Sequence, residues 1–147
     1  MILVDANLLL YAVNRDLPPH QEAHAWLERV LSGSEGVGLP WIVLLAFLRL
    51  TTSGRIFEHP LTVQDASAYM EQWLSQPVVT IPTPGPAHWP ILCNLLAQTG
   101  SGGNLTTDAH IAALALEHGY TVCSCDHDFK RFPGLKHVNP LEPWGQA

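Results

Sequence analysis

The stretch TDAHIAALALEHGYTVCSCDHD, Thr107 to Asp128, decides the expected fold. Its first part is rich in alanine and predicts a helix from about Thr107 to His118, which Gly119 ends, because glycine is common just past a helix terminus. The short apolar run from Tyr120 to Ser124 predicts a buried strand. The acidic turn Asp126 to Asp128 follows directly. We therefore expect a helix, a strand and then carboxylates presented where the strand ends.

The rest of the chain alternates in the same way. Short strands are expected at Met1 to Val4, Val37 to Leu39, Val78 to Ile81 and Lys136 to Asn139. Helices are expected at Asn7 to Asn14, His20 to Leu31, Trp41 to Thr52, from Thr62 onward, and Pro86 to Gln98. Short strands separated by longer helices predict an α/β fold, in which helices cover both faces of a short parallel sheet.

The size and composition of the chain predict one domain, residues 1–147. Its 147 residues are 47% hydrophobic and 14% charged, which is enough for a sizeable core. The longest apolar run, Leu39 to Leu50, is shorter than the roughly 20 residues that a membrane-spanning helix needs. The start of the chain lacks the features of a signal peptide. We expect a cytoplasmic protein with no membrane partner, and the odd set of three cysteines predicts free thiols.

The charge of the chain limits how it could bind RNA. A formal net charge of −6 argues against a protein that binds only by neutralising phosphates. Any RNA activity must therefore use a bound metal and a local basic patch. Arg49, Arg55, Lys130 and Arg131 are the candidates for that patch, and the alternative is that they are ordinary solvated charges.

Three aspartates are expected at one edge of the sheet. Asp5 and Asp126 each come just after a strand, and Asp108 is near the start of a helix. In parallel α/β sheets this edge is where ligands bind. Each residue also has a simpler interpretation: a helix cap for Asp5, a partner of the helix dipole for Asp108, and turn formation for Asp126.

Taken together, these carboxylates favour a metal site. Carboxylates that converge repel one another unless a cation neutralises them. Mg²⁺ and Mn²⁺ prefer carboxylate and water oxygens. Such a site suits the hydrolysis of phosphodiester bonds, because the ion polarises a phosphoryl oxygen.

Four segments of the chain resemble the motifs of one family. They are ILVDAN (Ile2 to Asn7), WIVLLAFLR (Trp41 to Arg49), TDAHIAALA (Thr107 to Ala115) and SCDHDFKRF (Ser124 to Phe132). In this order and spacing they resemble the four regions typical of VapC-type PIN domains, from Met1 to about Pro140. The resemblance implies a PIN-like α/β/α sandwich with a short parallel central sheet flanked by helices.

The resemblance also implies an activity and a set of site residues. VapC-type proteins are metal-dependent endoribonucleases, the toxins of bacterial toxin–antitoxin pairs, and usually act on transfer RNA or ribosomal RNA. By this resemblance Asp5, Asp108 and Asp126 bind Mg²⁺ or Mn²⁺, and Asp128 is a further acidic ligand. Asn7 and Ser124 would hydrogen-bond to these ligands and orient them.

Partners are implied as well. A VapB-like antitoxin would lay its C-terminal segment into a groove near the early helices, where Trp26, Trp41 and Phe47 offer apolar surface. The alternative is that these aromatic residues belong only to the core. A homodimer and a toxin–antitoxin hetero-oligomer are the expected assemblies.

The sequence departs from the family pattern at Ala46, where the family has glutamate before Phe-x-Arg. The departure removes one carboxylate and should weaken the metal site. One hypothesis is an engineered substitution that protects an expression host, and the other is a naturally weakened paralogue.

Two rival functions stay open. The first is a PIN-fold module that binds RNA or antitoxin without turnover, which the loss of a carboxylate at Ala46 favours. The second is a small-molecule phosphatase with Asp5 as nucleophile. That reaction usually needs a second aspartate two residues later, where this chain has Asn7.

Overall fold

A parallel sheet of five short strands forms the centre of the molecule. The computed structural model describes residues 1–100, 102–103 and 105–142. The strands lie in the order β3-β2-β1-β4-β5, and each neighbouring pair is parallel. Their bounds are β1 Ile2–Val4, β2 Val37–Gly38, β3 Val79–Thr80, β4 Thr121–Cys123 and β5 His137–Val138. The expected α/β class with a parallel sheet is confirmed.

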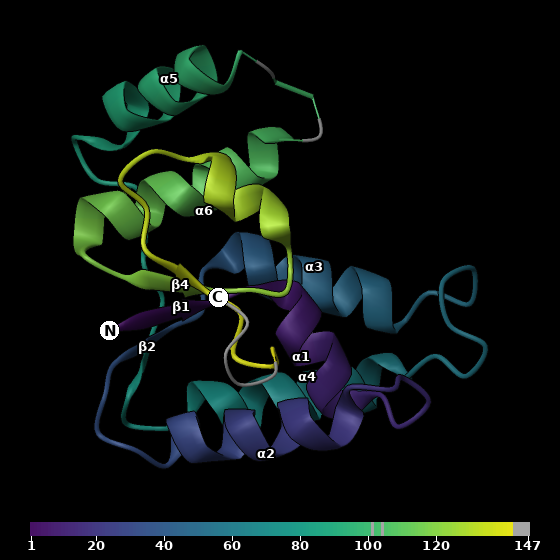
Figure 1. The fold of residues 1–147 in the computed structure, drawn as a ribbon. Coiled ribbons are helices and arrows are strands. Elements are labelled where there is room, and N and C mark those ends of the chain that lie inside the picture. Colours follow the sequence, from purple (N-terminus) through teal and green to yellow (C-terminus); the bar gives the residue numbers. More distant parts are fainter. Residues whose placement is uncertain (101, 104, 143–147) are drawn as a thin grey trace.

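Helices cover both faces of the sheet. Their bounds are α1 Ala6–Val13, α2 His20–Leu31, α3 Trp41–Thr51, α4 Val63–Leu74, α5 His88–Thr99 and α6 Leu105–His118. Figure 1 shows α5 and α6 on one face, α2 and α4 on the other, and α1 and α3 toward the end where the strands finish. Among the described residues, each helix is too short or too polar to span a bilayer.

Local signals explain several of these boundaries. Asp5 precedes α1 and its side chain accepts a hydrogen bond from the Ala6 amide. Thr62 caps α4 by accepting from the Asp65 amide, as its sequence predicts. Gly100 ends α5 with a left-handed φ of 68°, which glycine adopts without strain.

Other boundaries differ from the prediction. Helix α5 begins at His88 rather than Pro86, and α6 begins at Leu105 rather than Thr107. The earlier start still leaves Asp108 in the first turn of α6. The acidic turn leads into a short 3-10 helix, η1, over His127–Arg131, which the sequence did not predict. Of the expected loop Gly100 to Asn104, positions 101 and 104 lie outside the described residues.

The core fills the space between the sheet and the helices. Leu3, Val4 and Val122 from the sheet are completely buried, as is Phe47 on α3. Trp26 is also buried, so Trp26 and Phe47 are core residues rather than an exposed surface for a partner. Trp41 is different, since half of its surface is exposed.

Candidate active site

Three aspartates gather where the parallel strands end. Asp108 comes from the first turn of α6, Asp126 follows β4, and Asp128 lies in η1. One oxygen from each carboxylate lies within 4.8 Å of the others, which makes these three residues the acidic group.

Asp5 is next to the acidic group but is held differently. Its Oδ1 accepts from the Ala6 amide at 2.8 Å, and its Oδ2 accepts from the Ser124 hydroxyl at 2.7 Å. Asn7 Nδ2 lies 3.5 Å from the same Oδ2. Both oxygens of Asp5 therefore already have hydrogen-bond donors.

Ser124 joins the two sides of the site. Its hydroxyl donates to Asp5 and accepts from Asn7 Nδ2 at 3.1 Å and from the Asp126 amide at 3.0 Å. Asn7 Oδ1 in turn accepts from the Cys125 amide at 3.4 Å. A buried hydroxyl with one donated and two accepted bonds has no spare capacity. The side chains of Asn7 and Ser124 thus contact the predicted ligands, as expected for residues that orient them.

Electrostatic repulsion is concentrated on Asp108. Partial burial, then repulsion from Asp126 and Asp5, raises the pKa of Asp108 from 3.8 to about 7. Burial also raises the pKa of Asp5, with a smaller push from Asp126, while hydrogen bonds from Ser124 and Ala6 oppose the rise. Removing a proton from this edge is costly unless positive charge is supplied.

The donor set fits a hard divalent cation. Carboxylate oxygens are the ligands that Mg²⁺ and Mn²⁺ prefer. Among the residues that the structure describes, the ion pairs with carboxylates involve a histidine or the N-terminus. No Lys or Arg side chain of these residues lies within 4.0 Å of a carboxylate oxygen. The acidic group therefore lacks a protein cation that could take the place of a metal ion.

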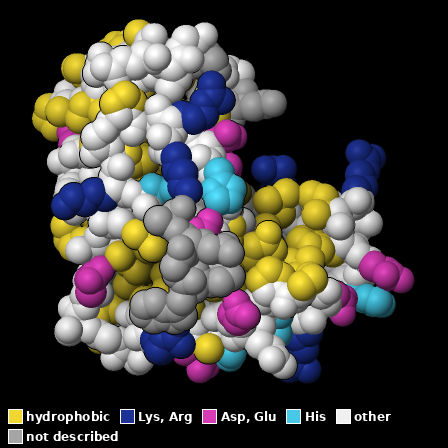
Figure 2. All heavy atoms as spheres, in the orientation of Figure 1, with side chains coloured by type: hydrophobic (Ala, Val, Ile, Leu, Met, Phe, Trp, Pro, Cys, Tyr) yellow, Lys and Arg dark blue, Asp and Glu magenta, His cyan; other side chains and the backbone are white. Residues whose placement is uncertain are grey.

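The remaining predicted residues come from α3, from the segment that follows it and from η1. Ala46 is partly buried in the middle of α3 and packs against the core. Lys130 and Arg131 are exposed on η1, close in sequence to Asp128. Figure 2 shows basic side chains above and beside acidic ones in this part of the surface.

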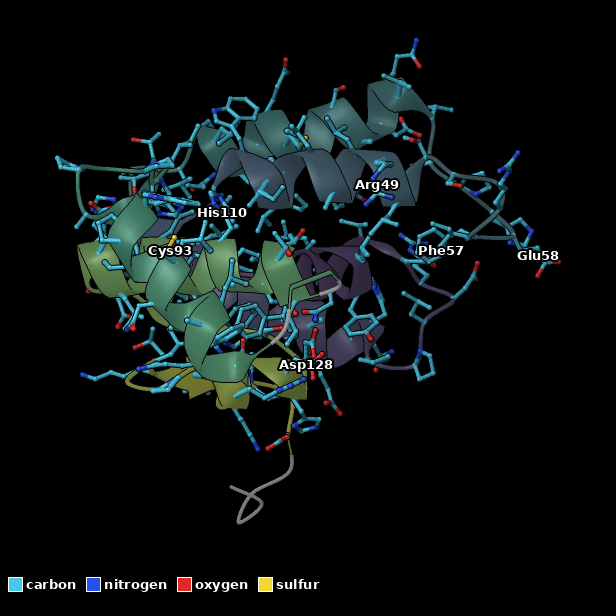
Figure 3. All side chains as sticks on the ribbon, turned by 90° about the horizontal axis from the view of Figure 1, so that it is seen from above. Arg49, Phe57, Glu58, Cys93, His110 and Asp128 are labelled. Atoms are coloured by element: carbon cyan, nitrogen blue, oxygen red, sulfur yellow. The ribbon has the colours of Figure 1, made fainter. Side chains whose placement is uncertain are left out.

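The two arginines of the α3 region are placed differently from each other. Figure 3 shows Arg49 on α3 itself. Arg55 belongs to the segment between α3 and α4, and the same view shows Phe57 and Glu58 of that segment extending away from the body of the molecule. Arg55 is therefore the candidate that lies outside a helix, in the segment between α3 and α4.

One contact of the site had no sequence signal. His137 Nε2 lies 3.0 Å from the carbonyl oxygen of Ser124. His137 is in a two-residue strand and 13 positions from Ser124, so neither spacing nor a motif could have indicated the contact.

Comparison with known proteins identifies the family of this chain. The PIN domain family matches residues 2–135. Ribonuclease VapC33 of Mycobacterium tuberculosis is 45% identical over 141 residues, which are 96% of this chain and 99% of the relative. This chain therefore belongs to the PIN-domain family and, within it, to the VapC ribonuclease toxins.

Solved structures show the same fold. The VapBC2 complex of Rickettsia felis, bound to a promoter DNA fragment, contains a chain with a TM-score of 0.67 and 22% identity, covering 94% of this chain and 98% of that one. VapC20 of Mycobacterium tuberculosis, described as a sarcin-ricin loop cleaving toxin, has a TM-score of 0.66 and 21% identity, covering 88% and 93%. The PIN-like α/β/α arrangement is thus confirmed.

Proposed function

We propose that this chain is a Mg²⁺- or Mn²⁺-dependent endoribonuclease, the toxin of a toxin–antitoxin pair, which cleaves structured RNA such as transfer or ribosomal RNA in the cytoplasm. The observation that carries the proposal is the acidic group, with three carboxylate oxygens within 4.8 Å. Membership of the VapC ribonucleases supports the reaction class.

Each residue has a defined task in this proposal. Asp108, Asp126 and Asp128 hold the ion. Asp5 is a fourth ligand, and the hydrogen bond from the Ser124 hydroxyl fixes the position of its Oδ2. The bound ion supplies polarisation of a phosphoryl oxygen. Asp108 gives up its proton when the ion binds, since its pKa is about 7 without one.

Phosphate contacts are assigned to the basic side chains. Arg49, Arg55, Lys130 and Arg131 are exposed, and none is paired with a carboxylate within the described part of the chain. An unpaired cation can bind phosphate without first breaking an internal contact. A small basic rim would thus let an acidic protein hold RNA.

The decisive experiment is digestion of transfer and ribosomal RNA with Mn²⁺ and with EDTA. Asp126→Asn should abolish cleavage, and EDTA should do the same. Cleavage that persists in EDTA would overturn the metal mechanism.

Ala46→Glu tests the missing carboxylate. An added ligand should raise Mn²⁺-dependent cleavage by about tenfold or more, since changes around a metal site commonly alter affinity or activity by 10–100-fold. Ala25→Glu is the matched control, because Ala25 is an exposed alanine on α2. Equal rates for Ala46→Glu and the unmodified chain would show that position 46 is not a ligand position.

A binding module without turnover is the second candidate, and Ala46 is the observation that favours it. Calorimetry separates the two functions. An active site should lose Mn²⁺ affinity in Asp5→Ala, whereas a vestigial site would bind equally weakly in both forms.

We assign the antitoxin to a groove between α1, α2 and α4. The pocket there has a volume of about 320 Å³, and its lining mixes apolar side chains such as Leu27 and Leu31 with polar ones such as Glu28 and Gln72. A groove with both apolar and polar walls suits a short amphipathic segment. Leu31→Arg should weaken binding of a VapB-like peptide without changing Mn²⁺ affinity.

A homodimer is proposed through α3. Trp41 and Leu45 are half exposed or more and lie four residues apart, so they form one apolar stripe. Figure 2 shows hydrophobic surface over α1 and α3. Leu45→Glu should convert the dimer to a monomer in light scattering, and an unchanged mass would place the interface elsewhere.

A further inference from the structure

His137 contacts the segment that carries two of the three acidic ligands. The carbonyl oxygen of Ser124 can only accept, so the 3.0 Å contact requires that His137 Nε2 carries the proton and donates. Its Nδ1 is buried and has no partner among the described residues. The imidazole of His137 therefore makes one hydrogen bond, from Nε2 to the Ser124 carbonyl oxygen, and this bond favours one orientation of that carbonyl.

The same ring touches the other end of the segment. The centroids of His137 and Phe129 are 5.7 Å apart at an interplanar angle of 34°. Phe129 belongs to η1 and is completely buried. His137 thus contacts Ser124 before the acidic turn and Phe129 after it.

The segment between these contacts is short and internally bonded. The Asp126 amide donates to the Ser124 hydroxyl at 3.0 Å, and the Asp128 amide donates to Asp126 Oδ1 at 2.9 Å. The Ser124 carbonyl shares its peptide group with the Cys125 amide, which donates to Asn7 Oδ1 at 3.4 Å. A rotation of that peptide would therefore break this bond and turn the chain that leads to Asp126. Metal sites are sensitive to such shifts, because partners of the ligands set the ligand orientation.

We propose that His137 is a positioning residue for the acidic turn, acting through its hydrogen bond to the Ser124 carbonyl and its packing against Phe129. The inference rests on the proposed function only in that Asp126 and Asp128 are taken as metal ligands. Its contacts with the turn exist without any ion.

The variants separate the hydrogen bond from the packing. His137→Phe keeps an aromatic ring and loses the donor, whereas His137→Gln restores a donor near the position of Nε2. His118→Phe is the matched control, because His118 Nε2 also contacts a backbone carbonyl, that of Thr83 at 2.7 Å, in another part of the molecule.

Two measurements test the proposal. Amide hydrogen exchange of Asp126 and Asp128, followed by NMR in metal-free protein, should be several-fold faster in His137→Phe. It should return toward the unmodified rate in His137→Gln and stay unchanged in His118→Phe. Calorimetry should show Mn²⁺ affinity about tenfold lower in His137→Phe only.

Each outcome is decisive. Unchanged exchange at both amides in a folded His137→Phe protein would overturn the positioning role, whatever the metal does. Equal effects in His137→Gln and His137→Phe would also overturn it, since the donor would then be irrelevant. Faster exchange in a chain that binds no Mn²⁺ would support positioning and contradict the proposed function instead.

Discussion

Asp5 and Asp108 stand at the same edge of the sheet, yet their surroundings differ. Asp5 receives hydrogen bonds on both oxygens, from Ala6 and Ser124. Asp108 instead has its pKa raised to about 7, first by partial burial and then by repulsion from Asp126 and Asp5. One carboxylate is thus anchored by donors, and the other is left in an unfavourable field. The difference indicates that the fold fixes the orientation of the Asp5 carboxylate in advance and leaves the charge of Asp108 to be neutralised by the proposed cation.

The largest expected effect comes from removing the unfavourable charge. Asp108→Asn should lower Mn²⁺-dependent RNA cleavage on the order of 10³-fold, because metal-ion catalysis supplies several kcal/mol. Asp65→Asn is the control, since Asp65 is likewise in the first turn of a helix but lies in the exposed part of α4. Gel-based cleavage rates decide the matter, and equal rates for both variants would remove Asp108 from the site.

Loss of the hydrogen bonds that hold Asp5 should lower the free energy of unfolding. Ser124→Ala removes the donor to Asp5 Oδ2 and the acceptor of the Asp126 amide in a fully buried place. The free energy of unfolding in urea should fall by about 1–3 kcal/mol. Ser75→Ala, at an exposed serine after α4, should cost less than about 0.5 kcal/mol. A loss at Ser124 no larger than at Ser75 would mean that the network adds nothing to the fold.

Metal affinity should depend on pH through Asp108. Below pH 7 the ion must displace the proton on this carboxyl, so Mn²⁺ affinity should fall about tenfold for each pH unit from 7 to 5. Calorimetry in buffers of different ionisation enthalpy should also show proton release near pH 6. An affinity that is flat over this range would contradict the raised pKa.

The smallest effect concerns the metal-free fold. The pKa of Asp108 is higher in the folded chain than its ordinary 3.8, so the folded state is favoured at low pH. This advantage is complete below about pH 4 and is lost as the pH rises through 7. At pH 8, Asp108→Asn should therefore stabilise the metal-free protein, by about 0.5 kcal/mol for a partly exposed charge. Urea titrations at pH 8, pH 5 and pH 3.5 should show that the gain shrinks at pH 5 and vanishes only below about pH 4.

The sequence could predict that the aspartates lie near one edge of the sheet because their positions follow from local rules. A carboxylate just after a buried strand reaches the same edge as others of its kind in any parallel sheet. The cap at Thr62 was likewise visible, since the residue and its partner are three positions apart. The sequence predicted that Asp5, Asp108 and Asp126 converge, with Asp128 as a further acidic residue. In the structure Asp108, Asp126 and Asp128 form the close group and Asp5 lies beside it, and the ligand roles of all four stay predictions.

Features that depend on distant contacts were not visible. Helix α3 is apolar almost all round, so its pattern could not tell buried Phe47 from exposed Trp41. The contact between His137 and Ser124 depends on how β5 pairs with β4. The start of α6 was placed two residues late because Thr106, a weak helix former, separates Leu105 from the alanine-rich part of the helix.

The absence of Lys and Arg contacts with carboxylates in the described part of the chain has a consequence for ionic strength. Screening weakens attractions between exposed charges, and here few such attractions support the fold. Raising potassium chloride from 50 to 300 mM should therefore leave the unfolding free energy nearly constant. The same change should markedly reduce affinity for RNA, because each phosphate contact releases counterions. Ionic strength should thus change RNA affinity while leaving the stability of the fold nearly unchanged.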